Sequence, residues 1–381
     1  MSEFTLIKNC DVFTPLRMIQ SGSILIEGEK IKRVGQFGDS GIPPGTRVFN
    51  FKNRVAVPGF IDIHLHGGGG EEFTDSSAES IITALKTHLK NGTTSLLPTL
   101  MTASHEQILN TIRTFLDIKN NNHDIPDIIG LNLEGPYISK EKRGVQRTQY
   151  IRRPSLAEMK EYIEVSQESI KIVTVAPEID GISAFIRFLT ERNIIPSAGH
   201  TNAGFEQTQQ AIEAGVRLAT HIFNAMRGIA HREPGAAGAL LLNDEVYAEV
   251  VADGIHIHPS ILSLIARAKP LERIILVTDA TRFYGVKQGA SYSKEGKLFG
   301  SNTALDLALK HMTRFTGMPF TQILKTVTTN PARLLKIEDQ KGLLKRGCDA
   351  DIVILDKEYQ VQEVFLRGKK LPHSERRPAA V

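Results

Sequence analysis

The chain has 381 residues, of which 41% are hydrophobic and 23% are charged, and its formal net charge is +4 at pH 7. This composition is ordinary for a globular protein that buries a large core. The small, dispersed charge argues against a nucleic-acid partner, and no run of about 18 apolar residues predicts a membrane span. Cys10 and Cys348 are too few for a disulfide framework, and the first residues do not resemble a signal peptide. We therefore expect a cytoplasmic protein with neither nucleic acid nor membrane as a partner.

Short β-strands are predicted at both ends of the chain. The segments with strand-like patterns are 5–9, 23–27, 30–34, 351–355 and 362–368. Because isolated strand pairs are only marginally stable, we expect residues 1–57 and 336–381 to form one small β domain, with the middle of the chain inserted into it. The alternative is two unrelated terminal pieces.

Between residues 58 and 335, apolar runs alternate with amphipathic helical patterns. The predicted strands are 60–66, 94–99, 128–134, 170–176, 195–200, 218–223, 246–252 and 273–279. The predicted helices include 77–90, 105–118, 155–166, 181–191 and 203–214. Eight strands separated by helices over roughly 280 residues are typical of a (β/α)8 TIM-like barrel of the α/β class. A doubly wound open sheet is the structural alternative.

Several of these strands end in side chains that bind metal ions. They are His64 and His66 on the first strand, Glu134 on the third, His200 on the fifth, His221 on the sixth and Asp279 on the eighth. Each one alone is more often a structural or solvated residue. In a barrel, however, the carboxyl ends of all strands face the same mouth, so the side chains are expected to converge there. The joint pattern predicts a hydrolytic metal site.

The donor types suggest how such a site works. Glu134, His200 and His221 provide two nitrogens and one oxygen, which suits a catalytic Zn²⁺ ion with an open position for water. The ion would lower the pKa of that water and supply hydroxide near neutral pH. Asp279 is the expected general base, which takes the proton from the water and returns it to a leaving nitrogen. His64 and His66 can hold a second ion, with Glu134 bridging the two.

Longer blocks of sequence resemble a known family. The run 58–66, Pro-Gly-Phe-Ile-Asp-Ile-His-Leu-His, and the run 330–335, Asn-Pro-Ala-Arg-Leu-Leu, are similar to the amidohydrolase superfamily. Within it, the blocks 133–137, 199–203, 220–226, 232–235, 252–256 and 278–281 resemble the N-acetylglucosamine-6-phosphate deacetylases. The resemblance extends over essentially the whole chain.

This resemblance implies a barrel framed by a small β-sandwich, and metal-dependent hydrolysis of N-acetyl-D-glucosamine 6-phosphate to D-glucosamine 6-phosphate and acetate. It assigns the principal metal to Glu134, His200 and His221, and the catalytic acid–base role to Asp279. It also implies a homodimer in which Arg232 reaches the phosphate in the neighbouring subunit's site. The substrate-binding positions that it implies are Val145, Gln146, Asn224, Ala225, Arg232, His256, Leu298, Phe299 and Gly300.

The chain departs from members of the family at three places. Some relatives carry Gln at the position of His66 and use one metal, whereas His66 leaves a second metal site available. Many members read Lys-Gly-Ala-His where this chain has Arg143-Gly144-Val145-Gln146, and their histidine polarises the substrate carbonyl. Gln146 donates a hydrogen bond but is no acid, so the metal would contribute more of that polarisation. The segment 282–297, which follows Asp279, is shorter than usual. The alternatives are another amidohydrolase, such as a cyclic amidase or deaminase, and a non-catalytic binding protein with the same fold.

Overall fold

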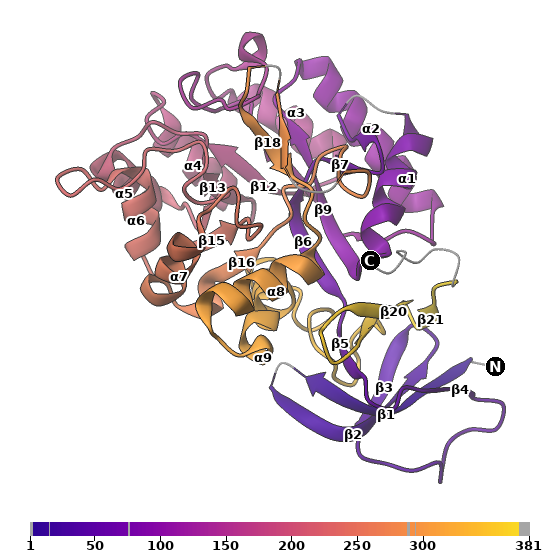
Figure 1. Ribbon diagram of the computed structural model, residues 1–381. Helices are drawn as coiled ribbons and strands as arrows, with labels where there is room; N and C mark the ends of the chain where they lie inside the picture. Colours follow the sequence, from indigo (N-terminus) through magenta and orange to yellow (C-terminus); the bar gives the residue numbers. More distant parts are fainter. Residues whose placement is uncertain (1–2, 15, 75–76, 288–289, 294, 373–381) are drawn as a thin grey trace.

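The structure is a computed structural model that describes residues 3–14, 16–74, 77–287, 290–293 and 295–372. Figure 1 shows a barrel surrounded by helices, with a second sheet built from both ends of the chain lying to one side of it. No helix within the described residues is long and apolar enough to cross a membrane.

Eight parallel strands within the described ranges form the barrel. They are β6 (Phe60–Leu65), β9 (Thr93–Met101), β11 (Leu131–Glu134), β12 (Ile170–Val175), β13 (Ile195–Ala198), β14 (Leu218–Ala219), β15 (Tyr247–Val250) and β16 (Ile274–Leu276), with β10 (Asp127–Ile128) beside β9. The ring closes between the first strand, β6, and the eighth, β16. Just after β16, the Asp279 N–H donates to the carbonyl of His64 on β6 at 2.9 Å. The predicted (β/α)8 barrel is confirmed, and the doubly wound alternative is wrong.

Helices cover the outside of the barrel (Figure 1). They are α1 (Ala78–Leu89), α2 (His105–Asn121), α3 (Leu156–Val165), α4 (Ile182–Thr190), α5 (Phe205–Ala214), α6 (Gly235–Leu242), α7 (Pro259–Ala268), α8 (Leu305–Thr316), α9 (Phe320–Ile323) and α10 (Thr329–Leu334). Serine side chains cap α1, α2 and α3, since Ser77, Ser104 and Ser155 each accept a backbone N–H three residues later. These caps fix where the helices begin after their loops.

A second sheet joins the two ends of the chain. Its strands are β1 (Phe4–Thr14), β2 (Arg17–Glu27), β3 (Lys30–Gly35), β4 (Arg47–Asn50), β5 (Val55–Pro58), β19 (Ile352–Leu355), β20 (Val361–Leu366) and β21 (Lys369–Lys370). The pairing of β5 with β19 links the two ends, and a shared core includes Ile7, Ile24, Ile352 and Phe365. The exact domain limits, 1–57 with 336–381 and 58–335, stay a prediction.

Two short strand pairs lie in loops of the barrel. They are β7 (Gly67–Gly68) with β8 (Glu71–Glu72), and β17 (Ala290–Tyr292) with β18 (Leu298–Ser301). The bridge between Ala280 and Ser301 attaches β18 to the loop that carries Asp279. The hairpin therefore lies next to the predicted catalytic side chain.

Candidate metal centre

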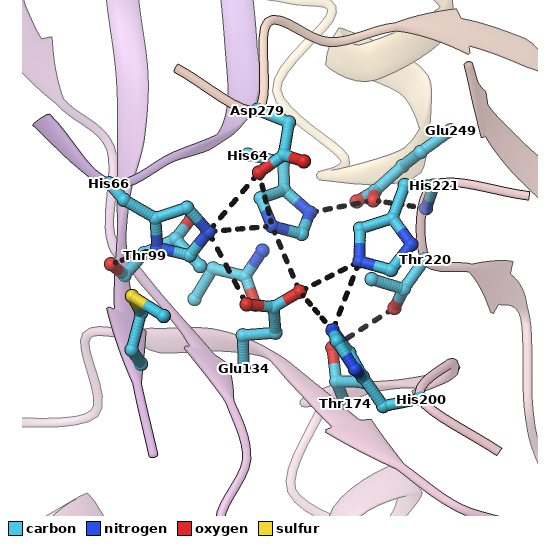
Figure 2. Close-up of polar contacts among 12 residues, drawn as sticks. His64, His66, Thr99, Glu134, Thr174, His200, Thr220, His221, Glu249 and Asp279 are labelled. Carbon is cyan, nitrogen blue, oxygen red and sulfur yellow. Dashed lines mark hydrogen bonds and ion pairs between the residues drawn. The ribbon is translucent and has the colours of Figure 1, made fainter. Parts of the chain in front are cut away.

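The predicted ligands come together at the carboxyl ends of the barrel strands. Figure 2 shows the imidazoles of His64, His66, His200 and His221 gathered around the Glu134 carboxylate, with Asp279 beside them. The exposed fraction of each histidine, averaged over the whole residue, is 5% or less. Side chains that are up to 215 residues apart in sequence, from position 64 to position 279, thus share one buried cluster.

Glu134 is at the centre of this cluster. Its Oε1 atom lies 3.0 Å from His200 Nε2, 2.8 Å from His221 Nε2 and 3.4 Å from His64 Nε2. Its Oε2 atom lies 3.3 Å from His66 Nε2. The two oxygens therefore face different histidines, which is the arrangement expected of a carboxylate placed between two ions.

A second group of donors adjoins the first. The Nε2 atoms of His64 and His66 are 3.2 Å apart, and Asp279 Oδ1 lies 3.3 Å from His66 Nε2 and 3.7 Å from His64 Nε2. One ligand atom from each of these three residues lies within 4.8 Å of the others. The same holds for His64, Glu134 and His221, so His64 belongs to both candidate groups.

Hydrogen bonds on the far side of the rings fix which nitrogen faces the cluster. His66 Nδ1 donates to the Thr99 carbonyl at 3.1 Å, and His200 Nδ1 donates to the Lys142 carbonyl at 2.8 Å. His64 Nδ1 lies 2.8 Å from a carboxylate oxygen of Glu249. Since a carbonyl oxygen only accepts, a neutral ring must present an unprotonated Nε2 to the cluster. Such outer contacts commonly orient histidines that bind metals.

These contacts indicate that the residues fit a metal ion. His64 and His66 place two acceptor nitrogens 3.2 Å apart, and His200 and His221 place their Nε2 atoms at the same separation. Two acceptors repel each other at that distance unless a proton or a cation lies between them. Ligand atoms about 2.0–2.1 Å from a tetrahedral Zn²⁺ ion are separated by roughly 3.3 Å, which is close to the spacings found here.

The backbone at three of these positions is left-handed. The φ angles of His200, His221 and Asp279 are 45°, 28° and 47°, a region that residues other than glycine rarely occupy. Uncommon backbone angles of this kind concentrate at functional sites. Gly300 packs against this turn, and an added Cβ atom there would lie 2.5 Å from the Asp279 carbonyl oxygen. The β18 hairpin therefore requires glycine where it contacts the Asp279 loop.

The charges in the cluster stabilise one another. Burial disfavours ionised groups, but the hydrogen bond with His66 and the charges of the surrounding histidines lower the pKa of Asp279 to about 2. Burial likewise opposes a charged imidazole, yet the hydrogen bonds with Asp279 and Glu134 raise the pKa of His66 to about 9. The site thus keeps its carboxylates ionised at neutral pH and attracts positive charge.

A cavity of about 320 Å³ opens from the cluster. Among the predicted substrate-binding residues, those that line it are Val145, Gln146, Asn224, Ala225, His256, Leu298, Phe299 and Gly300. The cavity is also lined by Asp279 and by four of the predicted metal ligands, which are His66, Glu134, His200 and His221. Residues that follow six different barrel strands therefore share one cavity.

Arg232 does not line this cavity. It is exposed on a tight turn in which Ala230 and Glu233 exchange backbone hydrogen bonds of 2.9 and 3.1 Å. Within a single subunit, the structure thus places Arg232 apart from the other predicted substrate contacts.

Gln146 forms a hydrogen bond with Glu134, one of the predicted metal ligands. Its amide nitrogen donates to Glu134 Oε2 at 2.6 Å, and its oxygen accepts the Thr102 backbone N–H at 2.7 Å. The bond from Thr102 sets the orientation of the amide, because only the oxygen accepts. One of the two hydrogens of the amide is therefore directed at Glu134.

The sequence interpretation missed one side chain of the cluster, Glu249 on β15. It is fully buried, and it contacts His64 Nδ1 and the backbone N–H of His221. A signal for it exists in the sequence, since it is the charged residue within the predicted apolar strand 246–252. Charged residues inside a barrel strand are rarely buried without a partner.

Comparisons with known proteins agree with this architecture. The family model of the amidohydrolase family matches residues 55–371. An N-acetylglucosamine-6-phosphate deacetylase from Bacillus subtilis is 33% identical over 97% of both chains. An N-acetylgalactosamine-6-phosphate deacetylase from Escherichia coli O157:H7 is 32% identical over 83% of this chain and 87% of its own. The crystal structure of the Pasteurella multocida N-acetylglucosamine-6-phosphate deacetylase has a TM-score of 0.90 at 28% identity, covering 97% of this chain and 99% of its own.

The fold, the sequence blocks and these similarities point to one family. The chain belongs to the amidohydrolase family, and within it to the amino-sugar-phosphate deacetylases.

Proposed function

We propose that the chain hydrolyses the acetamide of N-acetyl-D-glucosamine 6-phosphate, giving acetate and D-glucosamine 6-phosphate. The observation that carries this proposal is the convergence of four imidazoles and two carboxylates, Glu134 and Asp279, in one cluster that borders a cavity. It is supported by the similarity to the Bacillus subtilis deacetylase, which extends over 97% of the chain.

The donor set suits one or two divalent ions per subunit, for which we propose Zn²⁺. Glu134, His200 and His221 would hold the principal ion. His64, His66 and Asp279 would hold a second, with Glu134 between the two positions. A divalent ion there polarises an amide carbonyl and makes bound water reactive near neutral pH.

Asp279 is the group that we propose moves the proton. With a pKa of about 2, its carboxylate is ionised at neutral pH and can accept a proton from the attacking water. A new bond joins the water oxygen to the acetyl carbon. As the C–N bond breaks, Asp279 returns the proton to the amine nitrogen. Asp279 Oδ1 lies 3.3 Å from His66 Nε2, so the carboxylate faces the site.

The rest of the cavity is proposed to bind the sugar. Asn224, Ala225 and His256 lie on its wall, together with the β18 residues 298–300. His256 is held by its contact of 2.6 Å from Nδ1 to Asp253 Oδ2, so we propose that its other ring nitrogen, Nε2, contacts the sugar. Arg232 lies outside its own cavity, so we propose that it binds the phosphate in a partner subunit, where a guanidinium pairs well with phosphate.

The substrate is tested by following acetate release from the metal-loaded enzyme. We expect turnover with N-acetyl-D-glucosamine 6-phosphate and much slower turnover with unphosphorylated N-acetylglucosamine. The galactosamine epimer is assayed in parallel, because one similar protein is named for it. Equal rates with and without phosphate, or turnover of a cyclic amide without acetate release, would contradict the proposal.

The role of Arg232 in the partner subunit is tested by mixing inactive subunits. Arg232→Ala and Asp279→Asn are expected to be poorly active as separate homodimers. In a mixed dimer, one site combines a native Asp279 with a native Arg232 from the other subunit, so activity should reappear. Mixed dimers that stay inactive, or a monomeric enzyme, would show that Arg232 does not act across an interface.

A further inference from the structure

Glu249 is a fully buried acidic group next to the metal centre, and the proposed mechanism does not use it. Its side chain has no measurable exposure. Its Oε2 atom lies 2.8 Å from His64 Nδ1 and accepts the His221 backbone N–H at 3.1 Å. Its Oε1 atom is buried without any hydrogen-bond partner in the described part of the chain.

This arrangement is costly unless positive charge lies close by. A buried carboxylate needs a hydrogen-bonded, charged partner to offset the loss of water. Among the described residues, the group within ion-pair distance of Glu249 is the ring of His64, and no lysine or arginine is near enough. Glu249 therefore relies on the imidazole, and through it on whatever charge the imidazole contacts.

Figure 2 shows the His64 ring between Glu249 on one side and His66 with Glu134 on the other. With Nδ1 donating to Glu249, the neutral ring has its lone pair on Nε2, which faces His66 Nε2 at 3.2 Å. A carboxylate behind a histidine fixes its tautomer and makes it a stronger ligand. The same carboxylate oxygen holds the backbone of His221, so Glu249 links ligands from β6 and the β14 loop.

We propose that Glu249 is a positioning residue that holds His64 as a metal ligand and controls binding of a divalent ion by His64, His66 and Asp279. This inference rests on the proposed metal centre. It predicts that the affinity of this position depends on the carboxylate behind His64, although Glu249 contacts neither ion nor substrate.

The experiment compares Glu249→Gln with the wild type and with Thr174→Val. Thr174 is a buried barrel residue whose hydroxyl lies 3.0 Å from Thr220 Oγ1, so the valine controls for the loss of a buried polar contact. The proteins are stripped of metal and titrated with Zn²⁺ against a chromophoric chelator. The melting temperatures of the stripped proteins are measured in parallel.

For Glu249→Gln we expect one Zn²⁺ affinity to fall by roughly 10–100-fold, the usual effect of losing such an outer contact. The stripped variant should melt near the wild-type temperature, because the amide oxygen of glutamine can still accept from His64 Nδ1 and from the His221 N–H, although the carboxylate charge behind His64 is gone. Thr174→Val should show the reverse, with a lower melting temperature and unchanged affinity. Wild-type Zn²⁺ affinity in Glu249→Gln, or a loss that only accompanies a lower melting temperature, would overturn the inference.

The wild-type protein offers a second test that does not depend on a variant folding. Nitrogen-15 spectra of the histidine rings in the stripped protein, assigned with His64→Asn, should show His64 protonated at Nδ1. Protonation at Nε2 alone would refute the role of Glu249. If the wild type binds no Zn²⁺ at all, the proposed metal centre itself fails, which the titration distinguishes from a failure of Glu249 alone.

Discussion

Replacing Gln146 by alanine tests how the Glu134 carboxylate is held. Gln146 as a whole residue is 3% exposed, and its side chain joins the Thr102 N–H to Glu134 Oε2 through contacts of 2.7 and 2.6 Å. Alanine leaves both groups buried without that partner. The bond to Glu134 involves a charged acceptor, for which a contribution of about 1.5–3 kcal/mol is typical.

That energy corresponds to a change of roughly 10–150-fold in an equilibrium constant, at about 1.4 kcal/mol per factor of ten. Because Glu134 contacts His66 through the oxygen that Gln146 holds, we expect the loss to appear as weaker metal binding. The assay is Zn²⁺ titration of the stripped Gln146→Ala protein against a chelator, with turnover measured at saturating metal.

Gln146→Glu is the matched variant, since it keeps the size and the acceptor for Thr102. It places a second carboxylate oxygen against Glu134, so metal binding should weaken at neutral pH unless a proton is shared between the two carboxylates. The reasoning is refuted if Gln146→Ala binds Zn²⁺ as the wild type does and only the KM rises. That result would make Gln146 a substrate contact, as the family resemblance implies.

Three further predictions concern catalysis and stability. Asp279→Asn should lower turnover by roughly 10²–10⁴-fold while at least one metal ion stays bound, as measured by acetate release and metal analysis. Burial lowers the pKa of His88 to about 4, so below about pH 6.5 the unfolded chain binds more protons than the folded protein. Between pH 7 and pH 5, the free energy of unfolding of the wild type should therefore fall by roughly 2 kcal/mol more than that of His88→Gln, as measured by urea titrations. Lys269→Met should lower the free energy of unfolding, measured by urea titration, by about 1–3 kcal/mol. The reason is that the Lys269 ammonium donates to the carbonyls of Leu240 and Asn243 near the end of α6, at 2.9 and 2.6 Å. An unchanged free energy of unfolding would contradict this role.

The sequence was most informative where local pattern decides structure. The barrel strands are apolar runs of ordinary strand length, and serines at 77, 104 and 155 mark where helices begin. The ligands are predictable because a parallel barrel brings the ends of its strands to one mouth, whatever their separation along the chain. This rule predicts that Glu134 and Asp279 lie together.

Other features depend on side-chain direction, which local pattern does not set. The contact between Gln146 and Glu134 joins the loop after β11 to the end of that strand, and the contact between Glu249 and His64 joins β15 to β6 across the barrel. The place of Arg232 outside its own cavity depends on a turn whose orientation the sequence does not specify. Such loop geometry is determined by tertiary packing.

The central claim is that metal held by the strand-end histidines and carboxylates drives deacetylation. It is tested most directly by measuring acetate release from N-acetyl-D-glucosamine 6-phosphate as Zn²⁺ is added back to the stripped enzyme. We expect no turnover without metal, full activity at one or two equivalents per chain, and none in Glu134→Ala at the same metal concentration. Full turnover by protein that contains far less than one ion per chain would contradict the account.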